Sequence, residues 1–149
     1  MTYKEAEKKI TEVKDKYPKF SDEKCLKNNT DPNYRREEKL EAFIITYDLF
    51  KSKNLVKTKK STSYKSCANV FKNLSEAYVS YSDNPHKEQL KYVDWVGELY
   101  AAYAIMALGF TPEFKGGQIC FNISWESIKM IRREDEYLRR GISTWLILL

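Results

Sequence analysis

The sequence predicts a mainly α-helical fold, with about five helices packed around a central apolar helix and one small β-hairpin. Apolar residues recur at helical spacing over most of the chain. The central helix is expected over 85–108, and from Tyr92 to Leu108 it is apolar on nearly every face, which is typical of a helix buried at the centre of a domain. Helix breakers then interrupt the pattern and leave room for a hairpin over 110–123. Because the 149 residues contain no internal repeat and no linker-like stretch, we expect a single helical domain, 1–149.

The first helix is expected over 2–17. Thr2 and Glu5 have the spacing of a capping box, and Pro18 ends the helix because the residue before a proline disfavours the helical conformation. One apolar stripe runs along this helix, and it consists of Tyr3, Ala6, Ile10, Val13 and Tyr17.

A second helix is expected to be capped by Thr30 or Asp31, with Pro32 at its first position. The charges of 35–39 are spaced for ion pairs between neighbouring turns of a solvent-facing helix surface. The apolar face of the second helix consists of Leu40, Phe43, Ile44, Tyr47 and Phe50.

The third and fourth helices follow a polar stretch. Residues 57–63 contain no apolar side chain and are expected to form a loop, after which a helix begins near Tyr64. The fourth helix is the most clearly delimited: Asn84 caps it, Pro85 opens it and Gly109 follows its last turn.

A hairpin and a fifth helix complete the chain. The alternation of polar and apolar residues in 118–123 predicts a strand that pairs with 110–115 through a turn at Gly116-Gly117. An isolated hairpin is only marginally stable, so this one must lie on the helices. Ser124 is expected to cap the fifth helix, and Gly141 leaves open whether 142–149 continues it. Its apolar seam consists of Ile128, Ile131, Leu138, Ile142, Trp145 and Leu149.

Composition argues against several kinds of site. The cysteines, Cys25, Cys67 and Cys120, are odd in number and widely spaced, and His86 is the only histidine, so we expect reduced thiols and no metal site. We also expect no cofactor and no catalytic constellation, since the chain has neither a phosphate-binding glycine motif nor a nucleophile–base pattern. The absence of an apolar leader or spanning segment predicts a cytoplasmic protein without a membrane partner.

Positive charge is concentrated in one part of the chain. The first 60 residues hold 16 Lys and Arg against 11 Asp and Glu, whereas the remainder is balanced at 10 against 10. From Leu49 to Ser75 there are seven lysines and no acidic residue. Such a run binds phosphates by releasing counterions, and Tyr64 and Phe71 would offer stacking surfaces for bases. The expected binding residues are Lys53, Lys57, Lys59, Lys60, Tyr64 and Lys65. The alternative is a solvated loop.

A secondary basic face is expected on the fifth helix. It consists of Arg132, Arg133, Arg139 and Arg140, which form two rows at a spacing of seven residues. Asp135 and Glu136 precede the last two arginines by four residues, so a salt-bridged outer surface is the alternative interpretation.

Asp94 and Glu98 lie four residues apart on the predicted fourth helix. Paired carboxylates on one helix face can hold a cation or share acid–base work. With Lys87 and Lys91 they also form an ordinary solvent-facing stripe.

The stretch from Gly97-Glu98 to Gly109-Phe110 resembles the first helix of restriction-endonuclease-like nucleases. In that family the next strand carries an Asp and a Glu-x-Lys pair that hold Mg²⁺. Because the strand predicted here, 118–123, contains no acidic residue, the resemblance stops before the metal-binding motif.

The sequence therefore favours a small, basic, non-catalytic protein that binds nucleic acid or a nucleoprotein complex, such as a regulator or inhibitor from a phage or mobile element. One alternative is an immunity- or antitoxin-type inhibitor that recognises a protein through exposed aromatic residues such as Tyr34 and Trp125. The other is a small nuclease-type toxin that uses Asp94, Glu98 and an arginine. DNA, RNA and an acidic protein all match the same charge pattern.

Overall fold

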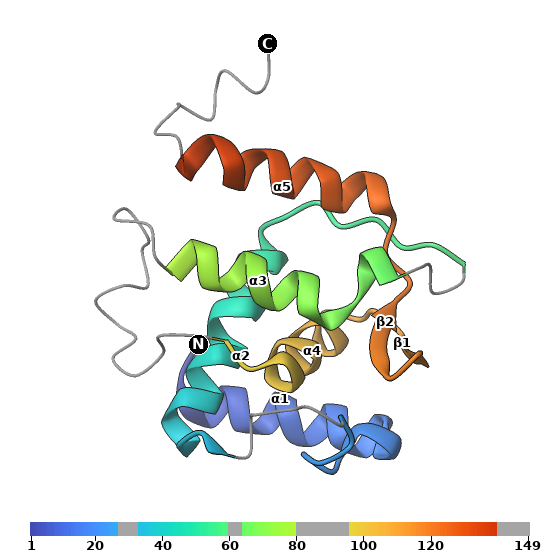
Figure 1. Ribbon diagram of the computed structural model, residues 1–149. Coiled ribbons are helices and arrows are strands. Elements are labelled where there is room, and N and C mark those ends of the chain that lie inside the picture. Colours follow the sequence, from blue (N-terminus) through green and yellow to red (C-terminus); the bar gives the residue numbers. More distant parts are fainter. Residues whose placement is uncertain (27–32, 60–63, 80–95, 140–149) are drawn as a thin grey trace.

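The computed structural model describes residues 1–26, 33–59, 64–79 and 96–139, and within them the fold is mainly α-helical with one two-stranded antiparallel sheet. In Figure 1, α1 lies at the bottom, α5 at the top and the other helices between them. The helices are α1 (Tyr3–Lys16), α2 (Arg36–Lys51), α3 (Ala68–Val79), α4 (Glu98–Ala107) and α5 (Trp125–Arg139), with short 3-10 helices η1 (Pro18–Phe20) and η3 (Tyr64–Ser66). The strands are β1 (Pro112–Lys115) and β2 (Gln118–Phe121).

Helix α4 forms the centre of the core, as expected for the apolar helix. Every residue from Leu99 to Met106 is buried, and α1, α2 and α3 pack around it. Gly109, with φ +99°, follows its last turn and confirms the predicted end. The predicted start at Pro85 lies in 80–95, outside the described residues.

The predicted helix over 85–108 is not continuous through residues 96 and 97. Gly97 is the N-cap of α4 and has an extended backbone (φ −68°, ψ 141°), so the helix begins only at Glu98. The backbone N–H of Val96 donates to Oε1 of Glu76 on α3, at 3.1 Å, which holds the chain extended as it enters α4. Asp94, the proposed partner of Glu98, lies outside the described residues.

Helix α1 is capped as predicted. The hydroxyl of Thr2 accepts from the backbone N–H of Glu5 at 3.1 Å, and the Glu5 carboxylate accepts from the backbone N–H of Thr2 at 3.4 Å. Ala6, Ile10 and Val13 are buried, which confirms the apolar stripe.

Helix α2 begins later than predicted, at Arg36 rather than Pro32, and Thr30, Asp31 and Pro32 lie outside the described residues. No side chain caps its start. Tertiary ion pairs hold the first turns instead: Arg36 binds Glu7 of α1, and Lys39 binds Glu23 at 2.8 Å. Of the local pairs expected in 35–39, Arg35 and Glu38 do approach to 3.5 Å. The predicted apolar face of α2 is fully buried.

The hairpin turns at the predicted glycines. Gly116 and Gly117 have φ of 57° and 81°, and two consecutive left-handed residues are what a type I′ turn requires. Pro112 lies opposite Phe121, and β2 packs against α3 and η3. The strand predicted over 118–123 is present over Gln118–Phe121, and Ile119, Cys120 and Phe121 are all completely buried.

Two of the three free cysteines lie opposite each other, one in β2 and one just before α3. Cys67 pairs with Cys120 across an isolated antiparallel bridge, and both side chains are buried. Burial raises the pKa of the Cys120 thiol, and the neighbouring Cys67 raises it further.

Helix α5 is capped by Ser124, whose hydroxyl accepts from the backbone N–H of Ser127 at 3.2 Å. Ile128 and Ile131 are buried, and α5 packs against α3. The seam residues from 138 onward, the side chain of Asp135 and the stretch 140–149 are not described. None of the described helices combines the length and the apolar character that crossing a bilayer requires.

Candidate nucleic-acid interface

The start of the lysine-rich segment, residues 56–58, is hydrogen-bonded to residues 122–124, which follow β2. Lys57 pairs with Ile123 in an antiparallel bridge. The backbone N–H of Ser124 donates to the carbonyl of Val56 at 2.8 Å, and that of Thr58 donates to the carbonyl of Asn122 at 2.9 Å. No helix or strand covers 57–59, as predicted for the loop, and backbone hydrogen bonds to the residues just beyond β2 fix its start. Residues 60–63 of the predicted loop lie outside the described residues.

The far end of the segment is tied to the same strand. The hydroxyl of Ser66 donates to the carbonyl of Phe121 at 2.9 Å, and Cys67 pairs with Cys120. The chain on both sides of 59–65 is thus bonded to 120–124, which places η3 and its Lys65 next to the start of α5.

Trp125, the first residue of α5, lies where the two predicted basic regions meet. The ammonium of Lys65 is 5.2 Å from the ring centre and the guanidinium carbon of Arg132 is 5.1 Å from it. Arg132 shares a helix face with Trp125 because seven residues make two turns. A cation above an aromatic face is attracted by the ring quadrupole. Two basic regions that are far apart in the sequence therefore form one surface.

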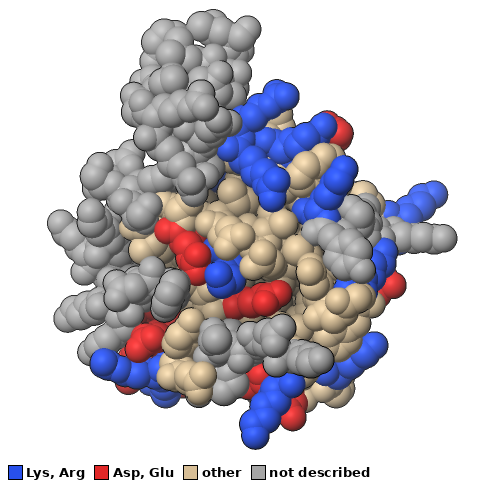
Figure 2. Space-filling view, in the orientation of Figure 1, with Lys and Arg blue, Asp and Glu red and all other residues tan. Residues whose placement is uncertain are grey.

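We call this surface the basic surface; it comprises Lys57, Lys59, Lys65, Lys129, Arg132 and Arg133. Lys65 and Arg132 flank Trp125, whereas the ammonium of Lys57 lies 5.8 Å from the ring centre of Phe110. Lys and Arg side chains gather along the top and upper right of Figure 2, over α5 and the segment before η3. Two ion pairs lie within or beside it: Lys129 binds Glu126 at 3.0 Å and Lys53 binds Glu134 at 2.6 Å. Exposed cations without an ion pair to any described residue are Lys57, Lys59, Arg132 and Arg133.

The predicted site residues separate into three groups. Lys57, Lys59, Lys65, Arg132 and Arg133 lie on the basic surface. Lys53 is half-buried and fastens the segment to α5 through Glu134, so its position is structural. The remaining positions, which are Lys60, Arg140 and the side chains of Tyr64 and Arg139, lie outside the described residues.

The predicted stacking role of Phe71 is wrong. Phe71 is completely buried and packs edge to face against Phe50 and Phe121, with ring centres 5.1 and 5.9 Å apart. Its place on the apolar face of α3 explains this burial. Trp125 is the aromatic side chain that accompanies the cations, and its spacing to Arg132 was the sequence signal for this role.

The described residues offer little support for a metal site or for a protein-recognition site. No three His, Cys, Asp or Glu side chains of residues 1–26, 33–59, 64–79 and 96–139 come together as metal ligands. His86 lies outside these ranges. The aromatic residues expected to recognise a protein, Tyr34 and Trp125, are both half-buried. In the comparisons with known proteins, no family model matches the chain, and no curated protein or solved structure is significantly similar to it.

Proposed function

We propose that the protein is a non-catalytic binding protein whose basic surface holds the phosphate backbone of a nucleic acid, alone or in a nucleoprotein complex. The observation that carries this proposal is the meeting of Lys65 and Arg132 at the ring of Trp125. It joins the lysine-rich segment to α5 and so concentrates charge that the sequence distributes over two regions.

The chemistry of the surface favours phosphate over base recognition. Over 53–59, 64–66 and 125–134 the described side chains include seven cations and two carboxylates. Both carboxylates are engaged by Lys53 and Lys129, so the excess charge faces solvent. Lysines recognise phosphates as point charges and do not match the geometry of a particular base edge. We therefore expect binding that tolerates many sequences and weakens with salt.

The test is a titration of a fluorescently labelled single-stranded oligonucleotide, followed by anisotropy at several salt concentrations. In the triple variant Lys57→Ala, Lys59→Ala, Lys65→Ala, affinity should fall. The slope of log K against log salt should become shallower by about 0.7 for each lysine–phosphate interaction that the substitutions remove, since each such interaction on a single strand releases that share of a counterion.

The matched control removes three exposed lysines elsewhere: Lys4→Ala, Lys8→Ala, Lys24→Ala. It lowers the net charge equally but leaves the basic surface intact. Its salt slope should stay near that of the unchanged protein. Equal slopes in the two triple variants would show that binding follows net charge and not this surface.

A second candidate partner is an acidic protein, and one observation favours it. Val56 and Met130 are 50% and 48% exposed, although both lie on the elements that carry the cations. Exposed apolar side chains among charges are more typical of a protein interface than of a phosphate-binding one. Met130→Ser separates the two: it should weaken binding of a protein partner and leave the salt slope for an oligonucleotide unchanged.

A further inference from the structure

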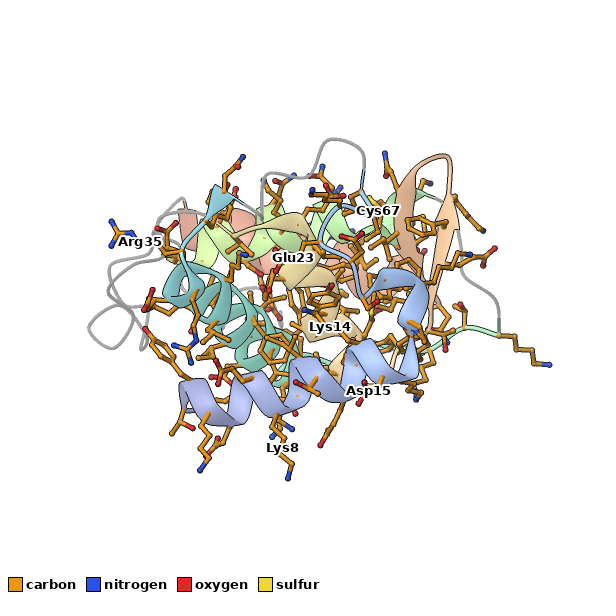
Figure 3. The ribbon with its side chains drawn as sticks, turned by 90° about the horizontal axis from the view of Figure 1, so that it is seen from below. Lys8, Lys14, Asp15, Glu23, Arg35 and Cys67 are labelled. Carbon is orange, nitrogen blue, oxygen red and sulfur yellow. The ribbon has the colours of Figure 1, made fainter. Side chains whose placement is uncertain are left out.

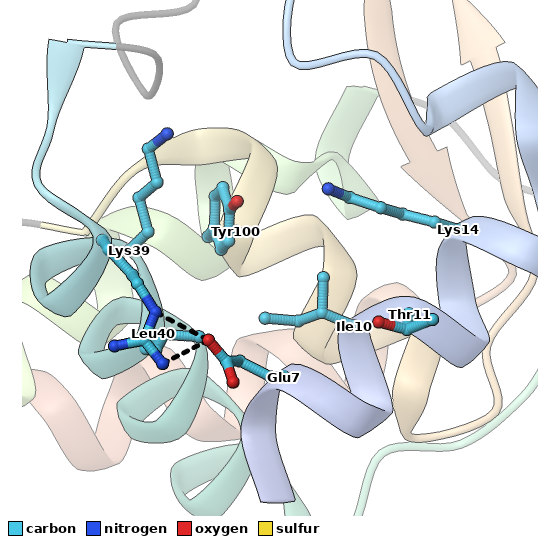
Figure 4. A pocket seen from close by; sticks show the side chains of 8 residues that line it. Glu7, Ile10, Thr11, Lys14, Lys39, Leu40 and Tyr100 are labelled. Carbon is cyan, nitrogen blue, oxygen red and sulfur yellow. Dashed lines mark hydrogen bonds and ion pairs between the residues drawn. The ribbon is translucent and has the colours of Figure 1, made fainter. Parts of the chain in front are cut away.

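A pocket of about 440 Å³ lies between α1, α2 and the first turn of α4, at the end of the molecule away from α5. Its volume falls within the range of small-molecule sites, roughly 300–1,000 Å³. Figure 4 shows its wall, in which Ile10 and Leu40 supply apolar surface. The other lining residues are Glu7, Thr11, Lys14, Arg36, Lys39 and Tyr100.

Most charged groups of the pocket already have partners. Arg36 donates through its Nε and Nη2 to the Glu7 carboxylate, as the dashed lines in Figure 4 show. Lys39 donates to Glu23 at 2.8 Å, and the hydroxyl of Tyr100 donates to the other oxygen of the same carboxylate. Because of these interactions, Arg36 and Lys39 have few N–H groups left to donate to an incoming anion.

Lys14 is the exception. It is half-buried, and no carboxylate of the described residues forms an ion pair with it, although its charge acts at longer range on Glu23, which already binds Lys39 and Tyr100. Its ammonium lies 5.6 Å from the ring centre of Tyr103, which is a weak substitute for an anion. Figure 3 shows Lys14 on the side of α1 that faces the body of the protein, whereas Lys8 points away from it. A half-buried cation beside an open pocket is suited to receive a negatively charged group.

We propose that this pocket binds a small organic anion, with its phosphate or carboxylate group on Lys14 and its apolar body against Ile10 and Leu40. The lining contains three cations and one carboxylate, and Glu23, which binds Lys39, is a second carboxylate beside it, so one positive charge remains in excess and the local field favours a negative ligand. The hydroxyl of Thr11, one turn before Lys14 on α1, is placed to donate a second hydrogen bond to the anionic group. The apolar wall selects an organic anion over inorganic phosphate, because a bare ion gains nothing from it.

The experiment titrates the full chain with phenyl phosphate, benzoate and inorganic phosphate, and follows binding by calorimetry. Phenyl phosphate or benzoate should bind more tightly than inorganic phosphate. Lys14→Met should weaken that binding roughly 10- to 100-fold, the usual value of a hydrogen bond to a charged group. Lys14→Arg, which keeps the charge, should retain most of the affinity.

Lys8→Met is the matched control, because it removes a lysine from the outer side of the same helix. It should leave the affinity unchanged, and thermal melting would show that all three variants fold. Absence of binding to the unchanged protein at millimolar ligand would overturn the proposal, as would equal losses of affinity in Lys14→Met and Lys8→Met. Oligonucleotide binding should not respond to Lys14→Met, so this test and that of the basic surface can fail independently.

Discussion

Glu23 shows how one carboxylate can connect three parts of the chain. It follows η1, accepts from Lys39 of α2 and accepts from Tyr100 of α4. Burial alone would raise the pKa of Glu23, but the hydrogen bonds from Lys39 and Tyr100 and the charges of Lys39 and Lys14 outweigh burial and lower the pKa below 4.5. The ionised form is therefore the one that the fold stabilises.

A pH-dependent contribution to stability follows from this pKa. Because the folded-state pKa lies below the unfolded one, the contribution is complete above the unfolded value of 4.5 and is lost as the pH falls through the folded value. Glu23→Gln should cost about 1 kcal/mol at pH 7, the difference between a hydrogen bond to a charged group and one to a neutral group.

Urea unfolding at pH 7 and at pH 3 measures this effect. The cost of Glu23→Gln should shrink at the lower pH, where the glutamate also becomes neutral. Glu12→Gln, at an exposed position of α1, is the control and should cost little at either pH. A cost at Glu23 that does not change with pH would mean that shape, and not charge, is what the site requires.

Individual residues were predictable from the sequence where local chemistry decides their role. The capping box of Thr2 and Glu5 depends on four consecutive residues and was predicted correctly. The positions of Lys53 and Phe71 depend on partners far along the chain, Glu134 and Phe121, which the sequence pattern does not reveal. The stacking role predicted for Phe71 is wrong because its ring is buried, and the binding role of Lys53 stays a prediction. The same long-range geometry brings Lys65 and Arg132 to one tryptophan.

The elements show a similar division. The hairpin was predicted at its turn because two glycines in sequence specify a type I′ geometry. The starts of α2 and α4 were not predicted, because tertiary interactions determine them. In α2, Arg36 binds α1 and Lys39 binds Glu23. Just before α4, the backbone N–H of Val96 donates to Glu76. Sequence signals for a helix start describe local caps, and neither of these helices has a side-chain cap at its N-terminus.

The turn offers a prediction about the hairpin. A β-carbon added at Gly117 would meet no atom within 4 Å, so any cost of Gly117→Ala comes from the backbone at φ +81°. That cost should be about 1–2 kcal/mol, the penalty for a left-handed residue with a β-carbon. Gly117→Asn should cost less, since asparagine tolerates this conformation better. Urea unfolding of both variants tests the expectation; equal costs would indicate that the turn has a different geometry.

The whole molecule depends on α4. Leu99 is completely buried, and Leu99→Ala should cost about 2–5 kcal/mol through reduced burial and the cavity left behind. This is a large part of the roughly 5–15 kcal/mol that stabilises a typical domain. Lys8→Ala, on the exposed side of α1, should cost well under 1 kcal/mol.

Circular dichroism and tryptophan fluorescence should report one shared urea transition for the unchanged chain and for Leu99→Ala, as expected if 1–149 is a single domain. Two separate transitions would show that part of the chain unfolds without α4. The fold class itself was predictable, because the apolar character of 98–107 and the periodicity of its neighbours are properties of the sequence alone.

The bridge between Lys57 and Ile123 has a consequence for synthesis on the ribosome. Translation proceeds from the N-terminus, so the lysines of the lysine-rich segment leave the exit tunnel well before β2 and α5, which hold them. Until residues 120–134 emerge, Lys53 has no Glu134 and Lys65 has no Trp125. The nascent chain therefore carries a run of lysines beside ribosomal RNA before the residues that hold them have been made, and the surface takes its final form only after residues 120–134 have emerged.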